Sequence, residues 1–84
     1  MTEFINMASE AIENEELVQI EFIGRREEYS LVTGILVSLD IENGIITLNG
    51  ERFYYSFPFN DCKCEDDSCI FELEGGILVF RKTD

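Results

Sequence analysis

Residues 34 to 55 read GILVSLDIENGIITLNGERFYY, and this stretch decides the fold. It contains two Asn-Gly pairs, Asn43-Gly44 and Asn49-Gly50, each lying between runs of aliphatic or aromatic residues. A two-residue type I′ turn needs positive φ at both central positions, which Asn tolerates and Gly adopts freely. Two such turns in succession predict a three-stranded antiparallel meander.

Outward from this meander, alternating apolar residues predict further strands, and a polar loop is expected over residues 60–68. We expect an N-terminal helix over residues 3–14 and strands over 17–23, 29–41, 45–49, 51–59, 69–74 and 77–82. Gly34 interrupts the second of these strands and predicts a sharp bend there. The fourth strand should carry much of the aromatic core, through Phe53, Tyr55, Phe57 and Phe59.

The chain has 84 residues, which we interpret as a single domain over 1–84 with room for one core. Its 45% hydrophobic residues, including seven Phe and three Tyr, supply enough apolar area for a small core. One helix followed by short strands predicts a mainly β fold of the α+β class. We expect a small, strongly bent antiparallel meander or an SH3/Sm-like barrel of five to six strands.

Part of the chain is similar to the YolD-like family, whose pattern is matched by Gly34, Leu36, Leu39, Asp40, Asn43, Ile46, Leu48, Glu51 and Phe53. The resemblance covers residues 11–57, including the lead-in from Ala11 to Phe22. It implies a small Sm/SH3-like barrel and a DNA-repair or mobile-element context, and it implies no particular activity. The chain departs from the family in its shorter N-terminal region and in its extra cysteine loop and final hairpin.

Charge is the strongest compositional signal. The chain has 18 acidic and 6 basic residues, which give a net charge of −12. Such a surface repels nucleic acids and anionic membranes. The same charge favours fast, salt-sensitive association with a basic protein, although it also serves simply to keep a small protein soluble. We expect a basic, nucleic-acid-binding protein as partner and no direct contact with nucleic acid.

The candidate partner-binding residues are twelve carboxylates, in one group before Arg25 and a second group within residues 61–74. They are Glu3, Glu10, Glu13, Glu15, Glu16, Glu21, Asp61, Glu65, Asp66, Asp67, Glu72 and Glu74. If the helix packs beside the last hairpin, the two groups merge into one negative face. Carboxylates along a convex surface imitate a phosphate backbone, so we interpret the chain, by analogy, as a phage-type DNA mimic that inhibits its partner.

An enzymatic function is not expected from this sequence. The chain has no His, which removes the usual general base, the Ser-His and Cys-His pairs and imidazole metal ligands. Paired carboxylates need a dry cleft to raise one pKa, and so short a chain offers little room for it. Phosphate-binding, dinucleotide-binding and nucleophile-elbow motifs are missing. We therefore expect a non-enzymatic module without a cofactor.

Three cysteines, Cys62, Cys64 and Cys69, follow a C-x-C-x4-C spacing. A structural zinc ion takes four Cys or His ligands, so a zinc-stapled regulatory module would need a carboxylate from Asp61, Asp66 or Asp67. A disulfide from Cys69 to Cys62 or to Cys64 is the other alternative. We favour reduced thiols with Cys69 facing the core. The acidic run over 65–67 lacks EF-hand spacing and is expected to be a solvated loop.

Neither a membrane-spanning apolar run nor a signal peptide is recognised, so we expect a cytoplasmic location with no membrane contact. Ile23, Tyr54 and Ile70 lie opposite the expected core. We favour a second core layer beneath the helix for them, and a docking patch or dimer interface is the alternative. The chain is expected to be a monomer or a homodimer, and a structural or oligomerising YolD-like or Sm-like barrel is the alternative function.

Overall fold

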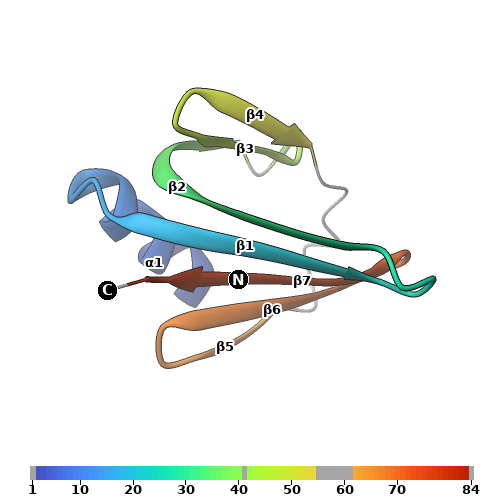
Figure 1. Ribbon diagram of the computed structural model, residues 1–84. Coiled ribbons are helices and arrows are strands. Elements are labelled where there is room, and N and C mark those ends of the chain that lie inside the picture. Colours follow the sequence, from blue (N-terminus) through green and yellow to red (C-terminus); the bar gives the residue numbers. More distant parts are fainter. Residues whose placement is uncertain (1, 41, 55–61, 84) are drawn as a thin grey trace.

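The computed structural model describes residues 2–40, 42–54 and 62–83. Its elements are α1 (Thr2–Glu13), β1 (Leu17–Gly24), β2 (Tyr29–Asp40), β3 (Ile45–Leu48), β4 (Glu51–Tyr54), β5 (Cys62–Glu65), β6 (Ser68–Leu73) and β7 (Gly76–Lys82). The strands form one antiparallel sheet in the order β4-β3-β2-β1-β7-β6-β5, and α1 lies against one end of it (Figure 1). The predicted mainly β, α+β fold with one N-terminal helix is confirmed.

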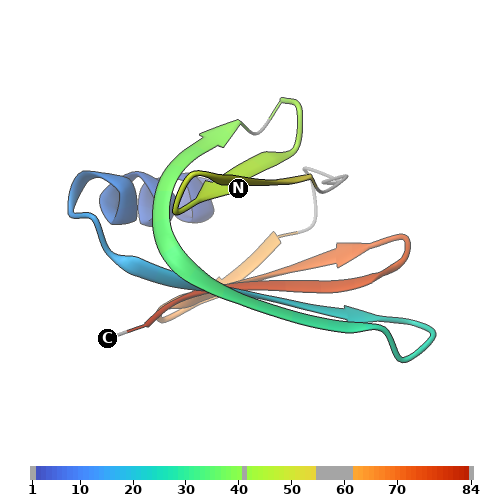
Figure 2. The ribbon, with the colours of Figure 1, turned by 45° about the horizontal axis from the view of Figure 1, so that its top comes forward.

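Two parts of the fold prediction are wrong. The sheet has seven strands instead of five or six, because Cys62–Glu65, which we assigned to a polar loop, forms β5. The sheet is strongly curled but not closed into a barrel, since β4 and β5 are its outer strands and each pairs on one side only in the described part of the chain (Figure 2). The predicted fourth strand is described only as far as Tyr54, so Tyr55, Phe57 and Phe59 lie outside the described residues.

The curl of the sheet depends on β2, which pairs with two different strands along its length. Up to Ile35 it pairs with β1, and from Leu36 onward it pairs with β3, with a bulge between Leu36 and Ser38. Gly34, where we predicted a bend, lies two residues before the first residue that pairs with β3. Asn49 in the β3–β4 turn explains why a glycine is needed, because its Oδ1 accepts a hydrogen bond from the Ile35 N–H at 2.9 Å. A Cβ at Gly34 would lie 2.7 Å from Asn49 Nδ2.

The two Asn-Gly pairs form different turns. Asn49 and Gly50 both have positive φ, 51° and 87°, and connect the paired residues Leu48 and Glu51, so the predicted two-residue turn is confirmed there. The prediction is wrong for the first pair, because β2 already ends its pairing with β3 at Asp40 opposite Ile45.

Asp40 explains this longer loop. Its carboxylate accepts hydrogen bonds from the backbone N–H and the side-chain amide of Asn43, at 3.2 and 2.8 Å. These bonds lower the pKa of Asp40 and hold Asn43 beside it, so that the connection to Ile45 is longer than a two-residue turn.

The core lies between α1 and the inner face of the sheet. The Phe4 ring of α1 meets Phe71 of β6 and Phe80 of β7 edge to face, with ring centroids 4.8 and 5.1 Å apart. Ala8 and Ala11 continue the buried stripe of the helix and let it approach the sheet closely. Each edge-to-face pair contributes about 0.5–1.5 kcal/mol beyond its buried area. This packing fixes α1 beside β6, the strand that carries Cys69, and beside β7.

Replacing Gly34 by Ala tests the contact between β2 and the β3–β4 turn. The new methyl group would crowd Asn49 and also Leu48 Cβ, at 3.2 Å, so we expect a loss of about 1–3 kcal/mol in the free energy of urea unfolding. Gly75→Ala is the matched control, because a Cβ there meets no atom within 4 Å and should change stability by less than about 0.5 kcal/mol. Equal stability of the two variants would contradict this account.

Candidate functional site

The strongest candidate site is a cleft between α1 and the turn that joins β5 to β6. It has a volume of about 350 Å³. Its lining residues are Glu3, Asn6, Met7, Glu10, Cys64, Asp66, Asp67 and Lys82. We call the four carboxylates in this set, Glu3, Glu10, Asp66 and Asp67, the acidic cleft. They come from both groups of acidic residues in the sequence, which the docking of α1 brings together.

Lys82, a residue that the sequence did not single out, neutralises part of this charge. Its Nζ lies 3.2 Å from Glu10 Oε1 and 3.3 Å from Glu16 Oε2, and its side chain is only 15% exposed. Burial alone would lower the pKa of Lys82, but its hydrogen bonds to Glu10 and Glu16 prevail and raise it. Among the described residues, the other three carboxylates of the cleft, Glu3, Asp66 and Asp67, form no ion pair.

The other predicted carboxylates lie elsewhere. Glu21 lies on the opposite face of the sheet, where it pairs with Arg81 at 3.2 Å and accepts a 2.6 Å hydrogen bond from the Tyr29 hydroxyl. That bond raises the pKa of Tyr29. Glu72 and Glu74 lie near the far end of the sheet, beside hollows that Arg25 also lines.

Three further carboxylates are exposed away from the cleft, namely Glu13, Glu15 and Glu65. Asp61 lies outside the described residues. The described carboxylates therefore gather partly at the acidic cleft and are otherwise spread over the molecule.

The sheet face turned away from α1 is rich in exposed apolar residues. The strand register places seven of them together on this face, which we call the outer face: Leu17, Ile23, Tyr29, Leu31, Ile35, Ile70 and Ile77. Ile23 and Ile70 are 43% and 42% exposed, and Tyr54, on the separate strand β4, is 68% exposed. The second core layer that we favoured for these three residues is therefore wrong. The sequence contained a signal of this exposed apolar face. The run from Tyr29 to Val37 has apolar residues on both faces of one strand.

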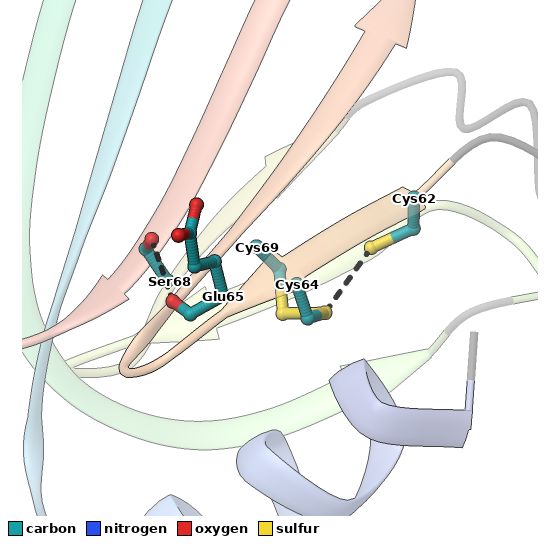
Figure 3. Close-up of a disulfide and its surroundings, with 5 residues drawn as sticks. All are labelled: Cys62, Cys64, Glu65, Ser68 and Cys69. Atoms are coloured by element: carbon teal, nitrogen blue, oxygen red, sulfur yellow. Dashed lines mark hydrogen bonds between the residues drawn. A yellow bond between two sulfur atoms is a disulfide. The ribbon is translucent and has the colours of Figure 1, made fainter.

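The three cysteines meet on the inner side of the β5–β6 hairpin (Figure 3). Cys64 and Cys69 are direct cross-strand partners and form a disulfide, whereas Cys62 is free with its Sγ 3.6 Å from Cys64 Sγ. The expected burial of Cys69 is confirmed, but the reduced state is wrong for Cys64 and Cys69, because the tight turn places their side chains opposite each other. Burial raises the pKa of the Cys62 thiol, and the charge of Glu3 adds to the effect.

Among the described residues, these three sulfur atoms are the only group of side chains placed closely enough to hold a metal ion. The three Sγ atoms lie within 4.8 Å of one another, and in the described part of the chain no carboxylate joins this group. The fourth zinc ligand that we considered is therefore not supplied by Asp66 or Asp67, and Asp61 is not described. Disulfides are rare in the cytosol, so the cytoplasmic location stays a prediction that this bond does not support.

Comparisons with known proteins give no relative from which a function could be carried over. No protein-family model matches the chain, and no curated protein or solved structure is significantly similar to it. The resemblance to the YolD-like family therefore stays a prediction. Among the described residues, no helix has the length and apolar character needed to cross a membrane.

Replacing Lys82 by Gln tests the charge balance of the cleft. We expect a loss of about 1 kcal/mol in the free energy of unfolding at neutral pH, because Glu10 and Glu16 then repel each other unpaired. Since folding raises the pKa of Lys82, its stabilisation is fully present below the ordinary lysine pKa of 10.5 and is lost as pH rises through the folded value.

Urea titrations at neutral and strongly alkaline pH measure both effects. The stability difference between Lys82→Gln and the unsubstituted protein should shrink at alkaline pH. Lys63→Gln, at an exposed position of β5, is the control and should leave stability almost unchanged. An equal loss for both variants would refute the role of Lys82.

Proposed function

We propose that this chain is a non-enzymatic protein-binding module that docks its acidic cleft on a basic surface of a partner. The observation that supports the proposal is the meeting of Glu3 and Glu10 with Asp66 and Asp67 around one cleft. These residues are far apart in the sequence but lie on a helix and a tight turn, both of which are held by the core. Rigid placement matters because carboxylates that are already positioned lose little entropy when they pair with a partner.

The partner class follows from charge. A net charge of −12 raises the local concentration of basic proteins and speeds their encounter with the cleft. Proteins that bind nucleic acids carry Lys and Arg in channels shaped for phosphate groups, and spaced carboxylates are complementary to such channels. We therefore propose a nucleic-acid-binding protein as the partner, with the acidic cleft taking the place of phosphates. Catalysis is not part of the proposal, because the chain has no His and its cleft offers carboxylates that are open to solvent.

Asp66→Asn/Asp67→Asn is the variant that tests this proposal. It removes two charges from the cleft, and Asn suits the positive φ of Asp66. Glu42→Gln/Glu51→Gln is the matched control, because it removes two exposed charges outside the cleft. Immobilised protein would be used to capture partners from a cell lysate at low and high salt, with and without DNA as competitor.

We expect basic partners that DNA displaces and that bind more weakly as salt rises. Titration of a captured partner should show roughly tenfold weaker binding to the cleft variant and little change for the control. Equal binding by both variants, or binding that salt does not weaken, would reject the acidic cleft as the docking site.

Self-association through the outer face is a second candidate function, and a different observation favours it. By strand register, the charged side chains of this face are Glu21, Glu65, Glu72, Lys63 and Arg81. Their charges sum to −1, against −12 for the whole chain. Two copies could therefore meet here without strong repulsion, and the exposed apolar residues would be covered. This reading corresponds to the structural or oligomerising role that the sequence also suggested.

Light scattering distinguishes this second candidate from the first. A dimer formed through the outer face should persist or strengthen in high salt, because its contacts are apolar and salt screens the remaining repulsion. Leu31→Arg/Ile70→Arg should leave only monomer. Tyr54→Arg, on strand β4, introduces the same kind of charge outside this face and should not change the mass. A monomer at every salt and protein concentration would rule out this role.

A further inference from the structure

We infer that Cys62, Cys64 and Cys69 form a three-sulfur binding site for trivalent arsenic once the Cys64–Cys69 disulfide is reduced. The proposal concerns the inner side of the β5–β6 hairpin and is independent of the function proposed for the acidic cleft. It rests on the placement of the three sulfur atoms, on the lack of a carboxylate ligand beside them among the described residues, and on the charge of the chain.

The hairpin places all three sulfur atoms on one side. Cys62 and Cys64 are two residues apart on β5, so they point to the same face, and Cys69 lies directly across from Cys64 on β6. The three Sγ atoms lie within 4.8 Å of one another, and those of Cys62 and Cys64 are 3.6 Å apart. Three sulfur atoms that each lie about 2.3 Å from one ion are about 3.5 Å apart in a pyramidal site and about 4 Å apart in a flat one. Cleavage of the disulfide therefore leaves the thiols close to the spacing that such an ion needs.

The three available ligand atoms are all sulfur, which favours an ion that needs only three sulfur ligands. Thiolates select soft ions, and the chain has no imidazole that could complete a tetrahedral zinc site. Carboxylates do not belong to this group in the described part of the chain. Trivalent arsenic binds three thiols in a pyramid and keeps a lone pair in the fourth direction, so it needs no further ligand.

Charge and burial favour the same ion. Cys69 is fully buried, Cys62 and Cys64 are half-buried, and all three pack with the hydrophobic core. A cuprous or zinc complex with three thiolates would leave net negative charge in this half-buried place, within a chain of charge −12. The arsenic complex is neutral, because arsenous acid and three thiols give one arsenic trithiolate and three molecules of water.

The disulfide controls access to the site. In the oxidised chain, Cys64 and Cys69 are bonded to each other and leave Cys62 as the free thiol of the cluster. A phosphine reductant opens the bond by becoming a phosphine oxide, with one water molecule supplying the oxygen and the two hydrogen atoms of the new thiols. The reduced chain then offers three thiols, so binding should be strictly dependent on prior reduction.

Intact-protein mass spectrometry with sodium arsenite as the probe tests the proposal. The full chain, reduced with a phosphine and freed of reductant, should bind one arsenic atom with loss of three water molecules relative to arsenous acid. The Cys62→Ser variant should lose only two water molecules per arsenic and bind more than about tenfold more weakly, since the third intramolecular thiol is missing. The unreduced chain should bind none.

Circular dichroism and urea unfolding of the reduced proteins check that the Cys62→Ser variant is folded. Lys63→Gln is the control for a change in the same strand and should bind as the unsubstituted chain does. The proposal is overturned if reduced protein binds no arsenic, if it loses fewer than three waters, or if Cys62→Ser binds equally well. A Cys64→Ser variant is a second test. Arsenous acid that binds its two remaining cysteines should also release only two water molecules.

Discussion

The edge-to-face contact of Phe4 with Phe71 and Phe80 is the interaction on which the rest of the structure depends. The two sheet residues lie on β6 and β7, so the helix is held beside the β5–β6 hairpin, and it also contacts β2 of the curled part of the sheet. A helix as short as α1 is marginal in isolation and derives its stability mainly from such packing. Its docking creates the acidic cleft, which Cys64 also lines, and brings Lys82 within reach of Glu10.

A consequence of this docking is that the two faces of the sheet differ in chemistry. The helix and the curled strands β2 to β4 enclose one face of the sheet. The outer face exposes apolar side chains and is nearly neutral in charge. The negative charge of the chain is concentrated elsewhere, and the part of it nearest α1 surrounds a cleft. One small domain therefore carries a polar and an apolar surface whose contacts would respond to salt in opposite directions.

Local signals in the sequence predicted most of the fold. The bend near Gly34 and the turn at Asn49 follow from backbone chemistry that only a few residues allow, so they could be read directly. The strand at Cys62–Glu65 was missed because its alternation of cysteine with charged residues is too short to stand out from a loop. The site was harder to predict, because the meeting of distant carboxylates depends on where the helix docks. The pairing of Cys64 with Cys69 likewise depends on a strand register that spacing alone does not determine.

The most direct test of this account is the nuclear Overhauser spectrum of the chain with its phenylalanine rings selectively labelled. We predict cross-peaks from the ring protons of Phe4 to those of both Phe71 and Phe80, because the ring centroids are 4.8 and 5.1 Å apart. A spectrum in which Phe71 and Phe80 contact each other or the sheet but never Phe4 would contradict it. The helix would then lie elsewhere, and the acidic cleft would not exist.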